Sequence, residues 1–349
     1  MFNFSISVSY CENILVNNLL VPLLPMSIHD KPFANGSIFL LVARLDSLSL
    51  FTGKSPAADS VFSALIAVFA VANALAKNRN QLFECCGRGR QVMFAFYNGE
   101  SLGNIGSSFH AYDLDKKRSH QKSVPFESEQ AEVPLSTLEL SGLETVHIDQ
   151  IGYLLELNQL AVHGGHRQFW LHERPPKTSK SLAINESSPP LYSLSDQLIE
   201  SAQTVPGVQL KLASSSRGND SKLPPIPPSS VHGFEVFNSS DHIEMAVITN
   251  HEKSFSNRYY HSVFDNELNV LPEGIDKLAK HLASIATVVS RAVASFLVNG
   301  SDHFNTTAIS ADVNLTRQLV KCIFTDRNCS LFQHIQRRQL YNESKFGSS

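Results

Sequence analysis

The segment with the clearest chemical potential is a turn at residues 98–108, whose sequence reads NGESLGNIGSS. Residues 99–103 satisfy the pattern GxSxG, which places a nucleophilic serine on a turn between a strand and a helix. Taken alone, this pattern predicts a serine esterase with Ser101 as the nucleophile. The downstream candidates are Asp241 or Asp265 for the acid and His251 or His261 for the base. The pattern fixes few positions and no oxyanion segment of HGGG type precedes it, so the esterase is the alternative hypothesis.

The same turn fits metal chemistry better. Residues 100–107, ESLGNIGS, are similar to the E-E-x-G-x-x-G-S turn of zinc-dependent aminopeptidases, in which the first glutamate is the general base and the second a metal ligand. Further positions match that family in chain order: Arg44 for the histidine of H-x-D-S, Asp59 for the bridging aspartate, Glu156 for another metal aspartate and His261 for the last histidine. The resemblance implies an aminopeptidase-like fold.

Two departures from that pattern remove its chemistry. Arg44 replaces an imidazole and Ser101 replaces a carboxylate, and a guanidinium stays charged in proteins and cannot ligate Zn²⁺. Without a metal, no bound water reaches a pKa of about 7 for Glu100 to activate. We therefore expect a pseudoenzyme with no metal, no cofactor and no catalytic residue. Two structural roles stay open: Glu100 caps a helix N-terminus, and Arg44 pairs with Asp59 or Asp46.

The elements that carry these residues are predicted from apolar periodicity. Residues 37–43 and 91–97 are continuous apolar runs of strand formers, and the apolar window 61–76 between them predicts a helix, which completes a βαβ unit. Further strands are predicted at 153–157, 168–171 and 244–249, and a long amphipathic helix at 275–298. The Ser- and Pro-rich stretches 174–206 and 213–231 are predicted to be surface loops. The fold class is α/β, with a mostly parallel mixed sheet flanked by helices.

Composition excludes several classes of protein. The chain has 349 residues with 29 basic and 32 acidic side chains, for a formal net charge of −3. Its densest basic stretch, residues 116–118, follows acidic residues, so no nucleic-acid partner is expected. The window 61–76 is shorter than the roughly 20 residues of a membrane span, which predicts a buried core helix. Residues 1–26 lack a basic n-region, and we expect the start to be internal to a longer protein.

Glycosylation sequons are unusually dense. Ten Asn-x-Ser/Thr sequons occur, roughly twice the number that this composition gives by chance. They begin at Asn3, Asn35, Asn185, Asn219, Asn238, Asn299, Asn305, Asn314, Asn328 and Asn342. This density favours a chain that passes through the secretory pathway and is glycosylated.

A degenerate aminopeptidase-like domain with many sequons resembles the nicastrin family, the large glycoprotein subunits of γ-secretase. The motifs that carry the resemblance are VARLDS at 42–47, GE with IGSS within 99–108, LELNQ at 155–159, LPP with PSS within 223–230, NRYY at 257–260 and ATVVSRA at 286–292. The resemblance covers residues 35–335. One departure is that Gly103 and Asn104 stand where the family has the Asp-Tyr of D-Y-I-G-S.

The resemblance implies a non-catalytic subunit that stabilises the complex and gates or recruits type I membrane protein substrates of the Notch and amyloid precursor class. Its partners would be presenilin, the other γ-secretase subunits and the N-terminal stubs of shed substrates. Substrate recognition would fall to Glu100, Ile105, Gly106 and Ser107. The resemblance also implies a luminal or extracellular domain in the secretory pathway and at the plasma membrane, and a disulfide between Cys322 and Cys329.

Three parts are predicted along the chain. Residues 1–34 would be a remnant of an N-terminal lobe or a linker, and residues 35–300 the degenerate aminopeptidase-like domain. Residues 301–349 would be a truncated helical extension. In this interpretation the chain is a partial one, without a signal peptide or a transmembrane helix.

Overall fold

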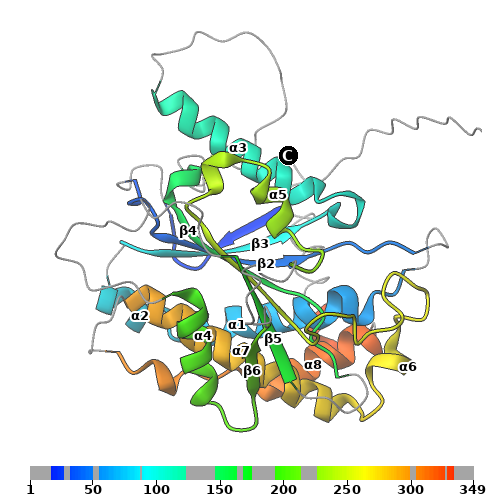
Figure 1. Ribbon diagram of the computed structural model, residues 1–349. Coiled ribbons are helices and arrows are strands. Elements are labelled where there is room, and N and C mark those ends of the chain that lie inside the picture. Colours follow the sequence, from blue (N-terminus) through cyan, green and yellow to red (C-terminus); the bar gives the residue numbers. More distant parts are fainter. Residues whose placement is uncertain are drawn as a thin grey trace, which may run out of the picture.

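A mixed β-sheet lies between two layers of helices in the computed structural model of the chain (Figure 1). The structure describes residues 17–26, 32–49, 55–86, 89–122, 146–162, 168–174, 193–213, 226–298, 304–326 and 328–333. Within these residues the sheet has seven strands in the order β1-β3-β2-β4-β7-β5-β6. The predicted fold class, a mostly parallel mixed sheet flanked by helices, is confirmed.

The centre of the sheet is parallel and its margins are mixed. The strands are β1 (Leu19–Pro22), β2 (Ile38–Arg44), β3 (Gln91–Tyr97), β4 (Ile151–Leu157), β5 (Gln168–Arg174), β6 (Gln209–Leu212) and β7 (Glu244–Thr249). β3, β2, β4 and β7 run parallel, β1 is antiparallel to β3, and β5 is antiparallel to β7 but parallel to β6. Every residue of β2, β3 and β4 is buried, because helices cover both faces and each strand can therefore be apolar throughout.

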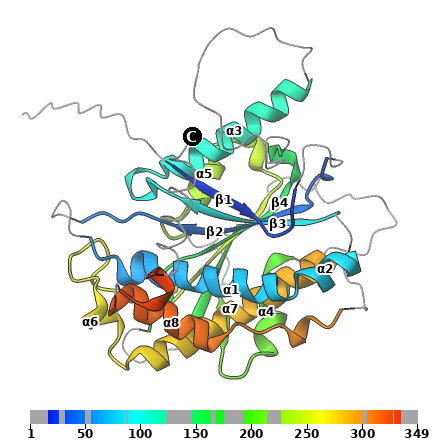
Figure 2. The same cartoon turned by 180° about the vertical axis from the view of Figure 1, so that it is seen from behind.

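Helices divide between the two faces of the sheet. The α-helices are α1 (Ala64–Lys77), α2 (Arg79–Cys86), α3 (Ile105–Lys122), α4 (Leu194–Gln203), α5 (Val231–Glu235), α6 (Glu267–Val270), α7 (Ile275–Val298) and α8 (Val313–Phe324). Short turns add the π-helix η1 (Ala58–Ser63) and the 3-10 helices η2 (Glu100–Leu102), η4 (Ile148–Gln150), η6 (Asn238–Ser240) and η7 (Thr306–Ala308). α3 packs against α5 on one face, and α1, α4 and α8 pack against α7 on the other, as Figures 1 and 2 show from opposite sides.

The main core lies between the sheet and α7. Phe39 on β2, Tyr153 on β4 and Phe296 on α7 form an aromatic group with ring centroids 5.3–5.8 Å apart. Two helical segments, Ala58–Lys77 and Ile275–Val298, are long and apolar enough to cross a membrane, but 78% of the apolar window of each is buried inside the structure. This burial is what core helices of a globular domain show.

Sequence reasoning missed several elements, among them β1, β6 and α4. The short strands β1 and β6 were not predicted, although β1 pairs with β3 and lies within residues 1–34. The prediction of a loop over 174–206 was wrong for residues 194–203, which form α4. Ser193 caps that helix by accepting the amide of Asp196 at 3.1 Å, and Leu194 and Leu198 are buried one turn apart.

Candidate functional site

The candidate site lies where the topology of an α/β sheet places ligands. The chain leaves β2 for β3 on one side and later adds β4 on the other, so the switch point of the sheet lies at the carboxyl ends of β2 and β4. Arg44 is the last residue of β2, Glu156 is the last but one of β4, and Tyr97 is the last of β3. All three lie at one edge of the sheet and are buried.

Arg44 and Glu156 form a buried ion pair. The Arg44 Nη2 atom lies 3.7 Å from Glu156 Oε1, and the two side chains are 3% and 0% exposed. Arg44 also donates to the Tyr260 hydroxyl at 3.3 Å and to the carbonyl oxygen of Pro228. The sequence had left Asp59 and Asp46 open as partners of Arg44, and its ion pair is with Glu156 instead.

Glu100 is held inside the protein by the helix that follows it. Its Oε1 accepts the backbone N–H of Ser107 at 2.8 Å, and its Oε2 accepts the Ser107 hydroxyl at 2.9 Å. Because Ser107 lies in the first turn of α3, Glu100 supplies an acceptor for an amide that the helix itself cannot satisfy. The predicted capping role of Glu100 is therefore present, and only 4% of the residue is exposed.

The side chain of Asp46 holds the turn that carries Glu100. The two oxygens of the Asp46 carboxylate accept the backbone N–H groups of Glu100 at 2.8 Å and Ser101 at 2.9 Å. Gly106 is required next to this turn, since a Cβ there would lie 2.3 Å from the Asn98 carbonyl oxygen. In the sequence, Asp46 was part of the RLDS motif and a possible partner of Arg44, and its hydrogen bonds to the turn join residues 54 and 55 positions apart.

The polar centre contains more acidic than basic groups. Two carboxyl groups, Glu100 and Glu156, share one neighbouring guanidinium, that of Arg44. Burial raises the pKa of Glu156 to about 7, against the attraction of Arg44, and the negative charge of Glu100 adds to the rise. Burial also raises the pKa of Glu100, although hydrogen bonds from Ser107 oppose it. One of the two carboxyl groups is therefore disposed to hold a proton near neutral pH.

Asp59 belongs to a different hydrogen-bond network. Its carboxylate accepts the Ala161 amide and the Ser63 hydroxyl, each at 2.8 Å, and the side-chain amide of Asn250 at 3.0 Å. Its own backbone N–H donates to the carboxylate of Asp265 at 2.9 Å. These contacts make Asp59 a structural link between η1 and the segments after β4 and β7.

His261 lies near the Arg44 cation but makes no hydrogen bond through Nε2, which is buried. It has a positive φ of 57°, and its ring stacks on Tyr260 with centroids 3.9 Å apart. Burial lowers the pKa of His261, and the Arg44 cation lowers it further. A neutral imidazole is thus favoured beside Arg44.

The predicted esterase residues are engaged elsewhere. The Ser101 hydroxyl donates to the carbonyl oxygen of Asp46 at 3.2 Å. Asp265 accepts the Ser60 hydroxyl at 2.6 Å in addition to backbone amides, and the His251 ring bonds Asn250 at 3.1 Å. Asp241 follows η6 at Asn238–Ser240. The geometry gives Ser101 a structural hydrogen bond in the turn rather than a general base.

The centre does not fit a zinc ion. Among the described residues, no group of three or more His, Cys, Asp and Glu side chains is placed to hold a metal ion. Of the positions matched to the aminopeptidase ligands, Arg44 carries a cation, Ser101 serves the turn and Asp59 is occupied by three donors. A guanidinium beside Glu156 takes the charge-balancing role that a metal would have.

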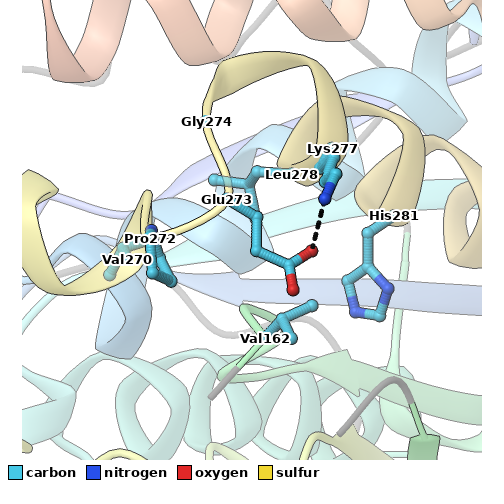
Figure 3. A pocket seen from close by; sticks show the side chains of 8 residues that line it. All are labelled: Val162, Val270, Pro272, Glu273, Gly274, Lys277, Leu278 and His281. Carbon is cyan, nitrogen blue, oxygen red and sulfur yellow. Dashed lines mark ion pairs between the residues drawn. The ribbon is translucent and has the colours of Figure 1, made fainter. Parts of the chain in front are cut away.

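A small pocket lies apart from this centre, at the start of α7 (Figure 3). Its lining residues are Val162, Val270, Pro272, Glu273, Gly274, Lys277, Leu278 and His281. Lys277 and Glu273 form an ion pair of 3.7 Å at its rim. None of the residues predicted for the site contributes to this pocket.

The remaining predicted residues have simple surroundings. Five sequon asparagines lie in the described part of the chain and all are exposed: Asn35, Asn238, Asn305, Asn314 and Asn328. The other five, Asn3, Asn185, Asn219, Asn299 and Asn342, lie outside the described residues.

The predicted disulfide is present: Cys322, on α8, and Cys329 are bonded to each other. Ile105 and Gly106 open α3, next to Ser107.

Comparisons with known proteins agree with this geometry. The family model described as the nicastrin large lobe matches residues 37–294. Human nicastrin is 27% identical over 342 residues, which cover 95% of this chain and 42% of the relative, so the chain spans less than half the length of that relative. A crystal structure of the γ-secretase component nicastrin superposes with a TM-score of 0.64 and 21% identity, over 90% of this chain and 47% of that one.

A zinc aminopeptidase from Bacillus subtilis is a more distant structural neighbour, with a TM-score of 0.46 and 14% identity over 79% of this chain and 48% of that one. The fold and the centre define a lobe with a mixed sheet between two helical layers and a buried ion pair at the carboxyl ends of its central strands. The chain belongs to the nicastrin family, as its motifs predicted.

Proposed function

We propose that this chain is the non-catalytic, aminopeptidase-like lobe of a γ-secretase glycoprotein subunit. The observation that carries the proposal is the buried ion pair of Arg44 and Glu156, at 3.7 Å. In the same centre, both carboxylate oxygens of Glu100 accept hydrogen bonds from Ser107. A peptidase needs an activated water and a free base at this point. Here Glu100, the residue matched to the base, caps a helix, and the cation is the guanidinium of Arg44, which is held by Glu156.

Within the complex, the lobe stabilises presenilin and the other subunits and acts as a steric gate. Glu100 is 4% exposed, so a substrate ammonium cannot reach its carboxylate without a rearrangement of the turn and α3. Bulk above a membrane excludes large ectodomains without any such contact. Substrates of the Notch and amyloid precursor class would therefore be admitted as short stubs left after shedding. Ile105, Gly106 and Ser107 would act by holding the turn beneath the surface that the stubs pass, because Gly106 and Ser107 are buried.

The same proposal places the lobe on the luminal side of the secretory pathway and at the surface of the plasma membrane, as a glycosylated part of a membrane complex. The exposure of every sequon asparagine in the described residues supports this, because oligosaccharyl transfer needs an accessible asparagine. The disulfide of Cys322 and Cys329 suits an oxidising compartment.

Assembly is tested by purification of the full-length parent protein through an affinity tag in mild detergent. Presenilin is expected to co-purify with it at a fixed ratio. A parent protein that accumulates at normal levels without bound presenilin would contradict the proposed role in assembly. Gating is tested in the purified complex with substrate stubs of increasing length, whose cleavage should fall with length and should not change when the stub N-terminus is acetylated.

The alternative is an active hydrolase. Purified protein is assayed on aminoacyl and acyl ester reporters with and without added Zn²⁺, and no turnover is expected. Zinc-dependent turnover abolished by Glu100→Gln would establish a metallopeptidase instead. Turnover abolished only by Ser101→Ala would establish the esterase.

A further inference from the structure

The crevice at the switch point of the sheet is filled by a segment of the chain itself. In open α/β sheets, ligands bind beyond the carboxyl ends of the strands at that point. Here Arg44 and Glu156 stand at the ends of β2 and β4, and residues 228–230 lie on them. Ser229 and Ser230 are 0% exposed, so this segment is buried against the strand ends.

The contacts to this segment are of the kind that hold a peptide ligand. The Pro228 carbonyl oxygen accepts from Arg44 and from the Asn158 side-chain amide, the latter at 2.9 Å. The Ser230 backbone N–H donates to Glu156 Oε2 at 2.5 Å. Side chains of β2, of β4 and of the residue after β4 thus bind one carbonyl and one amide of the backbone. Hydrogen bonds to charged groups, such as those of Arg44 and Glu156, are stronger than neutral ones.

The residues that follow extend the cover over Glu100. α5 begins at Val231, and a Cβ added at Gly233 would lie 2.1 Å from the Ser107 hydroxyl oxygen and 2.7 Å from the Ser108 amide. Only glycine allows α5 to approach α3 this closely. Phe234 is fully buried, and its ring lies 6.3 Å from that of Tyr97 and 6.1 Å from that of His110. Figure 1 shows α5 beside α3 on this face of the sheet.

We propose that residues 226–237 form an internal plug that occupies the ligand crevice through backbone contacts to Arg44, Asn158 and Glu156, and that an extended peptide binds there only when the plug is displaced. The part concerning peptides rests on the proposed function, since substrate stubs are the peptides that such a lobe meets. The plug itself follows from the contacts alone. It explains why a fold with a ligand crevice presents a closed surface above its polar centre.

Hydrogen exchange measured by mass spectrometry on the full chain tests the plug. Phe234→Leu loosens its anchor without removing any group that holds the backbone, and Phe169→Leu is the matched control, because Phe169 is equally buried but lies on β5. In Phe234→Leu the amides of residues 229–237 should exchange about tenfold faster than in the wild type, with β2 and β3 unchanged. Exchange of these amides only together with β2 and β3, in the variant and in the wild type, would overturn the plug.

Peptide access is measured by fluorescence anisotropy with a short labelled alanine–glycine peptide. Phe234→Leu should bind it about fivefold more tightly than the wild type or Phe169→Leu, because part of the cost of displacing the plug has been removed. Equal affinity in the three proteins, or no binding to Phe234→Leu, would contradict peptide access through this crevice. Co-purification with presenilin reports the proposed function independently, since it does not require the peptide to bind.

Discussion

Ser107 donates to both oxygens of the Glu100 carboxylate, through its amide at 2.8 Å and its hydroxyl at 2.9 Å. The carboxylate that the sequence motif matches to the base of aminopeptidases is thereby bound to the first turn of α3. The two residues act as one unit, because without Ser107 each oxygen of the buried carboxylate would lose a donor. The polar centre is in this sense part of the fold.

Ser107→Ala should therefore destabilise the chain. The substitution removes one donor to a buried carboxyl group, and we expect a loss of about 1–3 kcal/mol in the free energy of unfolding, measured by urea denaturation. Ser108→Ala is the control, since its neighbouring side chain is only partly buried and should change stability by less than about 0.5 kcal/mol. Equal stability of Ser107→Ala and the wild type would show that Glu100 does not depend on that hydroxyl.

The contribution of Glu156 to stability should rise as the pH falls toward about 5. Its folded-state pKa is raised from 4.5 to about 7, so between these values the folded chain holds a proton that the unfolded chain has lost. This contribution to the free energy of unfolding is highest at the acid end of the window and declines as the pH rises through it, whereas His251, whose pKa burial lowers to about 4, contributes in the opposite sense. Urea denaturation at about pH 5 and about pH 8 measures the difference.

Glu156→Gln should lower the stability at about pH 5 relative to that at about pH 8 by about 1–3 kcal/mol compared with the wild type, because glutamine cannot take up the proton. Glu244, whose pKa burial also raises to about 7, retains part of the dependence in this variant. The exposed Glu200 provides a control, since Glu200→Gln should leave the profile as it is. An identical pH profile in the wild type and Glu156→Gln would contradict the assignment of the proton to this pair.

Gly106→Ala should destabilise the start of α3. A Cβ at this position would lie 2.3 Å from the Asn98 carbonyl oxygen and 2.6 Å from Asn18 Oδ1, so the turn must move. We expect a loss of about 1–3 kcal/mol, which thermal unfolding can measure. Gly89→Ala is the control because nothing lies within 4 Å of the added Cβ, and a similar loss in both variants would point away from the clash.

The disulfide of Cys322 and Cys329 closes a loop with a sequence separation of 7. In the chain-entropy description a loop of this size contributes about 2 kcal/mol. The double variant Cys322→Ser with Cys329→Ser should therefore unfold at lower urea, and a reducing agent should lower the midpoint of the wild type to a similar value. No response of the wild type to the reducing agent would show that the bridge does not contribute.

Periodicity and turn chemistry predicted the elements that carry the site. The continuous apolar runs gave β2 and β3 to within a residue at each end, and α7 has the predicted bounds of 275–298. These elements are long or fully buried, so their pattern is strong. The strands β1 and β6 have four residues each and lie at the margins of the sheet, where burial is partial and the signal is weak.

Contacts between distant segments could not be predicted in the same way. The pairing of Arg44 with Glu156 requires the register of β2 and β4, which a single sequence does not contain. The contact of Arg44 with Pro228 joins residues 184 positions apart, and it involves a carbonyl group that every residue carries. α4 was missed because its amphipathic stretch lies within a Ser- and Pro-rich region, whose composition outweighed a ten-residue pattern.

The antiparallel strand β1 has a consequence for how the chain can be shortened. It covers the outer edge of β3, pairing Leu19 with Phe96 and Val21 with Phe94, and the buried Leu23 and Leu24 follow it. A protein that started at residue 35 would expose the backbone donors and acceptors of a long apolar strand. Such an edge invites pairing with another molecule, so the truncated lobe would aggregate although it kept every residue of the polar centre.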